Sequence, residues 1–103
     1  MDISEYQQIV QNFAFYPRDL GPYYTTMGAM STLGKLAERL RISLKNNNGK
    51  ISQNDKTKIA LAIGDVMYYL SCTATDLNIS LNDVCTTNIR AKSLQKEKEI
   101  LDS

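Results

Sequence analysis

Three helix-start signals constrain the fold of this 103-residue chain more than any other sequence feature. Each is an Asp or Ser followed three residues later by Glu or Asp, and they begin at Asp2, Ser52 and Ser80. Such a side chain accepts hydrogen bonds from the unpaired backbone N–H groups of a first helical turn, where an acidic residue is also favoured. Strand-like alternation is absent over any useful length of the sequence. The sequence therefore predicts an all-α protein.

The first two helices are predicted from apolar residues at helical spacing and from the helix breakers that follow them. The first helix starts after Asp2 and is ended by Pro17, and residues 18–22 form a loop. The second helix runs from about Tyr23 to Leu44. The segment 46–49, Asn-Asn-Asn-Gly, ends it, because Asn and Gly tolerate left-handed backbone angles.

The other two helices are predicted from the two remaining helix-start signals. Ser52 begins a third helix that ends near Asn78, and Ser80 begins a fourth. Residues spaced by three and four form apolar stripes on the second helix (Met30, Leu33, Ala37, Leu40, Leu44) and on the third (Ile59, Ile63, Val66, Leu70, Ala74, Leu77). The fourth helix carries the apolar residues Leu81, Val84, Cys85, Ile89 and Leu94.

The length of the second and third helices, roughly 30 Å each at about 1.5 Å per residue, is large for so short a chain. Long apolar faces in a small domain need partners to cover them, which favours an oligomer. A second group of aromatic residues and methionines fits either a dimer surface or the core of one chain: Tyr23, Tyr24, Met27, Met67, Tyr68 and Tyr69.

The composition excludes several kinds of chemistry. The chain has no His, so it has no histidine base, no Ser-His-Asp triad and no imidazole ligand for a metal. Its two cysteines alone cannot form a zinc site, so any metal site must be rich in oxygen ligands. We expect Cys72 and Cys85 to be buried thiols in a reducing cytosol. A net charge of +1 argues against nucleic-acid binding.

The length predicts a single domain over residues 1–103. No apolar run approaches the ~20 residues of a membrane span, and the acidic, polar start does not resemble a signal peptide. We therefore expect a cytoplasmic protein with no membrane partner. The small size and the repeated Asn and Lys residues suggest a phage or plasmid gene.

Two segments, 28–40 and 62–70, resemble the MazG-like all-α nucleotide pyrophosphohydrolases, and the second contains Gly-Asp-Val-Met-Tyr-Tyr-Leu. The segment 77–84 and the following Asn88 also match, so the similarity spans Tyr6 to Asn88. The resemblance implies a four-helix MazG-like bundle, completed when two chains form a homodimer or a higher oligomer.

The family's chemistry depends on four acidic residues, which bind Mg²⁺ from two facing helices. The metal neutralises a nucleoside triphosphate and activates the water that releases pyrophosphate. In this chain the four positions are Thr32, Lys35, Ala62 and Asp65, so only Asp65 is acidic. Glu38 also matches a family acid, but it lies outside the set of four. The resemblance therefore implies a degenerate member with no Mg²⁺ cofactor and no hydrolysis.

The loss of the acidic residues does not exclude ligand binding, because basic and aromatic residues could contact the phosphates and the base of a nucleotide. Lys35 occupies a metal-ligand position, where its ammonium group can pair with Asp65 or contact a phosphate, and Arg39 lies one helical turn further. Next to Asn88, Lys92 is either a phosphate contact or part of a solvated helix face, as are Arg90 and Lys96. Residues that could stack on a base are Phe13, Tyr16, Tyr23, Tyr24 and Tyr69.

The expected function is thus that of a pseudoenzyme that binds a nucleotide-type ligand or a host protein without hydrolysis. The candidate ligand-binding residues are Thr32, Lys35, Glu38, Arg39, Ala62, Asp65, Tyr69, Asn88 and Lys92. The alternative is an active pyrophosphohydrolase with a rearranged site, in which Asp65, Glu38 and a second subunit hold Mg²⁺.

Overall fold

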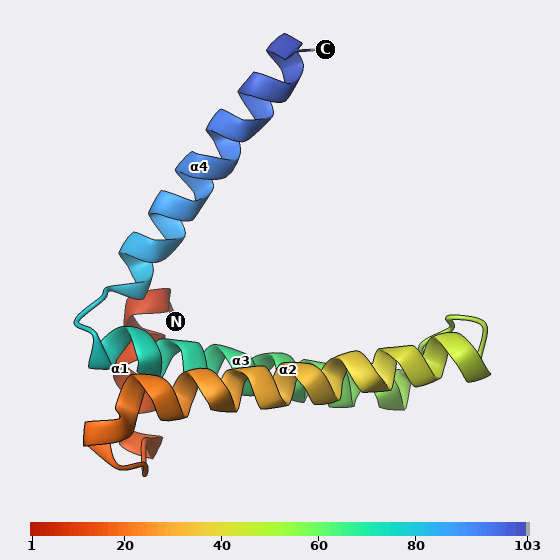
Figure 1. Cartoon of the computed structure of the whole chain (residues 1–103), viewed down its shortest axis with the longest axis horizontal. Coiled ribbons are helices and arrows are strands. Elements are labelled where there is room, and N and C mark those ends of the chain that lie inside the picture. Colours follow the sequence, from red (N-terminus) through yellow and green to blue (C-terminus); the bar gives the residue numbers. More distant parts are fainter. Residues whose placement is uncertain (103) are drawn as a thin grey trace.

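The computed structural model describes residues 1–102, and within this range every regular element is helical. Figure 1 shows a long hairpin of two helices, with α1 beside one end of it and α4 projecting away. The α-helices are α1 (Ile3–Val10), α2 (Gly21–Asn46), α3 (Gln53–Asp76) and α4 (Leu81–Asp102). Short 3₁₀ turns cover Gln11–Phe13 and Arg18–Leu20. No helix in residues 1–102 combines the length and the apolar character needed to cross a membrane.

All three predicted helix starts are confirmed. The Asp2 carboxylate accepts a hydrogen bond from the Glu5 backbone N–H at 2.8 Å, at the start of α1. The Ser52 hydroxyl accepts one from Asp55 N–H at 3.1 Å, at the start of α3. At the start of α4, the Ser80 hydroxyl accepts one from the N–H three residues later at 3.3 Å. These local interactions define where three of the four helices begin.

The second helix starts earlier than predicted, at Gly21 rather than Tyr23. Pro22 lies in its first turn, where a backbone N–H has no partner within the helix, so the proline does not interrupt it. The predicted loop over 18–22 is correspondingly shorter, and part of it is the 3₁₀ turn. α3 ends as expected near Asn78, which adopts a left-handed φ of 57°.

Small and polar residues form the contact between α2 and α3, which run antiparallel. The hydroxyl groups of Thr25 and Thr73 are hydrogen-bonded at 2.6 Å, and Thr25 is fully buried. Gly28 lies directly against the Tyr69 ring: a Cβ atom at this glycine would be 2.5 Å from the ring. At the other end of the hairpin, buried Ser43 donates to Asp55 at 3.4 Å. Small side chains thus let the two helices approach closely.

The apolar stripe predicted on α2 is not the face that meets α3. At about 100° per residue, its members lie roughly a third of a turn away from Thr25, Gly28 and Ser43. In an antiparallel pair, this stripe and the α3 stripe fall on the same side of the hairpin. Most of their large residues are exposed: Met30, Leu33, Leu40, Leu44, Ile63, Leu70 and Leu77. We call the exposed members of these two stripes the apolar face.

A polar cluster fastens the segment after α1 to the C-terminal half of α3. The Tyr16 hydroxyl donates to Asp76 at 2.7 Å, and the Arg18 guanidinium pairs with the same carboxylate at 2.9 Å. Tyr16 is buried, and this burial together with its bond to Asp76 raises the pKa of its phenol. The nearby Cys72 is fully buried, as expected. Cys85 lies exposed on α4, so the prediction that both thiols are buried is wrong for this residue.

Candidate functional site

A groove of about 250 Å³ lies between α2 and α3. At about 100° per residue, its charged residues fall on the side of the hairpin opposite the apolar face. It brings together five of the nine residues singled out in the sequence. From α2 these are Thr32, Lys35 and Arg39, and from α3 they are Ala62 and Asp65. The other residues that line the groove are Leu36, Lys58, Ile59 and Leu61.

Lys35 and Asp65 line the same groove, yet no ion pair joins them among the three found in residues 1–102. Arg39 instead pairs with Asp55 at 3.3 Å. The Arg39 side chain remains 41% exposed, so its guanidinium still faces solvent. Within the described chain, therefore, the Asp65 carboxylate does not neutralise the Lys35 ammonium group by direct contact.

Sequence reasoning missed Lys58, a third cation that lines the groove. Its position could have been found, because Lys58, Ala62 and Asp65 are spaced by four and three residues and so share one face of α3. The groove thus contains three basic side chains and a single carboxylate, that of Asp65. Arg39 is paired with Asp55, so Lys35 and Lys58 supply the charge that suits an anionic ligand.

The residues of the groove do not match the four-carboxylate magnesium site of the family that the sequence resembles. Mg²⁺ is bound through oxygen ligands, commonly one or two carboxylates together with phosphates. Here one carboxylate lies among the ammonium groups of Lys35 and Lys58 and the guanidinium of Arg39. In residues 1–102, no group of three or more acidic or cysteine side chains is placed to hold a metal ion.

Glu38 faces a second hollow, of about 440 Å³, which adjoins the groove and shares Lys35 and Arg39 with it. The Glu38 carboxylate accepts two hydrogen bonds from Arg41, at 2.6 and 3.0 Å. These bonds lower the pKa of Glu38 below its ordinary value. The far end of this hollow is lined by Ser43 and by the two amide side chains Asn46 and Asn47.

Besides Glu38, three predicted site residues lie outside the groove, and they line neither the groove nor the second hollow. Tyr69 packs over Gly28 and forms an edge-to-face pair with Tyr68, with ring centroids 5.3 Å apart. Asn88 and Lys92 lie on α4, which Figure 1 shows pointing away from the hairpin. Asn88 lines a separate hollow on α4, and Lys92 is exposed.

The other aromatic residues expected to stack on a base do not line the groove either. The Tyr16 ring is buried and stacks on Tyr24, with centroids 5.5 Å apart and planes at 12°. Phe13 and Tyr23 are exposed, by 60% and 74% of their surfaces. Among the described residues that line the groove, none is aromatic.

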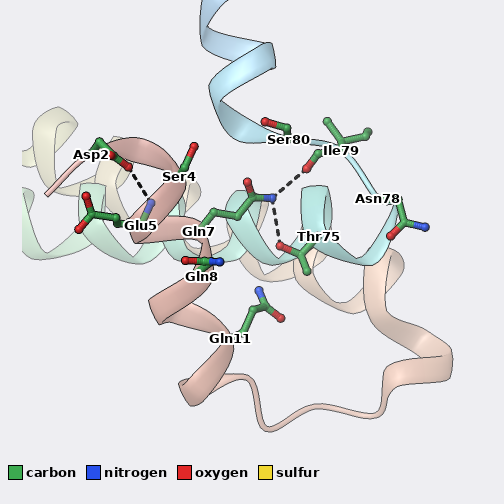
Figure 2. Close-up of a pocket in the computed structure, with 10 residues that line it drawn as sticks. All are labelled: Asp2, Ser4, Glu5, Gln7, Gln8, Gln11, Thr75, Asn78, Ile79 and Ser80. Atoms are coloured by element: carbon green, nitrogen blue, oxygen red, sulfur yellow. Dashed lines mark hydrogen bonds between the residues drawn. The ribbon is translucent and has the colours of Figure 1, made fainter.

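A larger polar hollow, of about 550 Å³, lies where α1, the end of α3 and the start of α4 meet. Figure 2 shows its side chains, with Gln7 reaching from α1 towards Thr75 and the backbone of Ile79. Its charged groups are the carboxylates of Asp2 and Glu5, and Asp2 already caps α1. This hollow contains none of the nine candidate ligand-binding residues.

The chain is similar to a phage protein. It is 26% identical over 107 residues to the Gene 37 protein of Mycobacterium phage L5, an alignment that covers 98% of this chain and 94% of that protein. No family model matches the chain, and no solved structure matches it. This similarity is consistent with the expectation of a phage gene. The alignment covers almost all of the residues that form the helices described above.

Proposed function

We propose that this chain is a MazG-like pseudoenzyme that binds a nucleotide-type ligand in the α2–α3 groove and does not hydrolyse it. The main support is that Thr32, Lys35, Ala62 and Asp65 converge on one groove, where Lys58 and Arg39 join them. Four positions that match family metal ligands thus share a site whose charge is suited to phosphates. The similarity to a phage protein favours a phage origin.

The groove binds phosphate through fixed charges in this proposal. Ammonium and guanidinium groups donate hydrogen bonds to phosphate oxygens and attract their negative charge. Lys35 and Lys58 approach the ligand from opposite walls, because one belongs to α2 and the other to α3. An ammonium group does not lower the pKa of a bound water as a metal ion does, so the ligand is held without being cleaved.

The test is a thermal unfolding experiment with a panel of nucleoside triphosphates in the presence of EDTA. A ligand at one hundred times its dissociation constant should stabilise the protein by about 2.7 kcal/mol. Lys35→Ala and Lys58→Ala should each weaken binding by roughly tenfold, if each removes one charged hydrogen bond of about 1.4 kcal/mol. Lys56→Ala is the matched control, since this exposed lysine of α3 does not line the groove.

Two outcomes would contradict the proposal. Magnesium-dependent release of pyrophosphate that is lost in Asp65→Asn would favour the rearranged enzyme over the pseudoenzyme. If no nucleotide raises the unfolding temperature, nucleotide binding is excluded, and a host protein is the remaining candidate ligand.

We also propose that the chain forms a homodimer in which two hairpins pair through the apolar face as a four-helix bundle. The accessible surface of one chain is 7876 Å², whereas a folded monomer of 11.6 kDa exposes about 5,800 Å². The excess is about 2,000 Å² per chain, or about 4,000 Å² for two chains, which falls in the range of roughly 2,000–5,000 Å² that obligate homodimers bury in total. The groove lies on the other side of the hairpin, so this pairing leaves it open.

A further inference from the structure

The second hollow, of about 440 Å³, continues the groove along α2. Lys35 and Arg39 line both spaces. From the first of these, spacings of three, four and four residues lead to Glu38, Ile42 and Asn46, so these side chains share one face of the helix with it. At about 1.5 Å per residue, Asn46 lies about 16 Å beyond Lys35 along the helix axis. A ligand that contacts both residues therefore extends from the groove to the loop end of the hairpin.

The charges of the second hollow differ from those of the groove. Two carboxylates line it, those of Glu38 and Asp55, and each accepts a hydrogen bond from an arginine. The cations that line it, Lys35 and Arg39, are the two that it shares with the groove, whereas Lys58 lines the groove alone. Since carboxylates repel phosphate, the charges favour phosphates in the groove and an uncharged group in the second hollow.

The far end of the second hollow offers contacts for an uncharged, hydrogen-bonding group. It is lined by the side-chain amides of Asn46 and Asn47, and within residues 1–102 neither amide is engaged in a hydrogen bond. An amide both donates and accepts, as the edge of a nucleobase does. Ile42 lines the same space with its side chain 44% exposed, so it offers apolar contact to a ring.

We propose that the second hollow is the nucleoside subsite of the ligand, so that the phosphates lie in the groove and the base lies against Asn46 and Asn47. This inference rests on the nucleotide binding proposed above and assigns the part of the ligand that the groove does not hold. Sites for small molecules enclose about 300–1,000 Å³. The groove alone, at about 250 Å³, is smaller than this range, and the groove and the second hollow together fall within it.

The test compares inorganic triphosphate with ATP, CTP, GTP and UTP, each titrated calorimetrically in EDTA at constant ionic strength. Inorganic triphosphate carries more negative charge than a nucleoside triphosphate, so charge alone favours it. Any advantage of a nucleotide therefore comes from its nucleoside. We expect at least one of the four nucleotides to bind at least tenfold more tightly than inorganic triphosphate.

The variants locate the source of that advantage. Asn46→Ala and Asn47→Ala should each weaken nucleotide binding by about fivefold, as expected for one neutral hydrogen bond, and change the binding of inorganic triphosphate by less than twofold. Both residues are exposed, so the substitutions remove no buried contact. Asn54→Ala is the matched control, because this exposed asparagine of α3 lines neither the groove nor the second hollow, and it should change neither ligand's binding.

The outcomes separate the subsite from the groove. If inorganic triphosphate binds as tightly as every nucleotide, the nucleoside subsite is overturned while phosphate binding in the groove stands. If a nucleotide keeps its full advantage in both Asn46→Ala and Asn47→Ala, its base lies elsewhere and the inference is also overturned. If neither inorganic triphosphate nor any nucleotide binds, the proposed function is overturned together with the subsite.

Discussion

At the scale of single residues, the two cysteines differ sharply in accessibility. Cys72 is fully buried, and burial raises the pKa of its thiol above the ordinary value of 9.0. Cys85 is exposed on α4. Because the thiolate is the reactive form, we expect one thiol per chain to react rapidly with a disulfide reagent at pH 8 and the second only after unfolding in guanidinium. The absorbance of the released thiol at each stage measures this directly.

Replacing Cys85 by Ser should abolish the rapid phase and leave the slow one unchanged. Two rapid equivalents in the native protein would show that the segment around Cys72 opens readily. Such a result would contradict the closed arrangement of Tyr16, Arg18 and Asp76 beside this thiol.

At the scale of elements, two glycines of α2 provide a matched pair for testing the hairpin contact. A Cβ atom at Gly28 would lie 2.5 Å from the Tyr69 ring, whereas one at Gly34 would meet no atom within 4 Å. We expect Gly28→Ala to lower the free energy of unfolding by about 1–3 kcal/mol, because Tyr69 must move out of its packed position. Gly34→Ala should raise it by about 0.5–1 kcal/mol through higher helix propensity. Urea unfolding of both variants distinguishes the two effects.

The comparison of the two variants tests packing and not helix formation, since both changes add the same methyl group to the same helix. Equal stabilisation by Gly28→Ala and Gly34→Ala would show that α2 and α3 are further apart than described. Equal destabilisation would indicate that a second copy covers Gly34.

The helix boundaries were largely predictable because they depend on local interactions. The hydroxyl of Ser52 bonds to a backbone N–H three residues away, and a sequence displays that distance directly. The contact face of α2 was not predictable in this way. Apolar spacing marks Met30 and Leu33 as one face, but the face that meets α3 contains Thr25 and Gly28, which have no strong hydropathy signal. Close approach, and not apolar burial, decides that contact.

At the scale of the whole molecule, the candidate site also divides into a part that was predictable from the sequence and a part that was not. The resemblance predicted that positions on two facing helices converge, and Lys35 and Asp65 do line one groove. It did not predict Lys58, because that position lies outside the segments that carry the resemblance. Asn88 and Lys92 lie apart from the groove, because the direction of α4 depends on the hydrogen bonds of Gln7 and not on the sequence of α4 itself. Long-range geometry of this kind has no local signature.

The overall dimensions of the chain lead to the last prediction. Its radius of gyration is 17.0 Å, whereas a compact protein of this length has about 13 Å and one of twice the length about 17 Å. A radius of gyration from X-ray scattering therefore does not distinguish an extended monomer from a compact dimer. The forward scattering intensity does distinguish them, because it is proportional to the molecular mass. We expect a mass of about twice 11.6 kDa at tens of micromolar.

Since unfolding of a dimer releases two chains, tenfold dilution should also remove about 1.4 kcal/mol of stability and lower the unfolding temperature by about 3–6 °C. A monomeric mass together with an unfolding temperature independent of concentration would mean that a different protein covers the apolar face of α2 and α3.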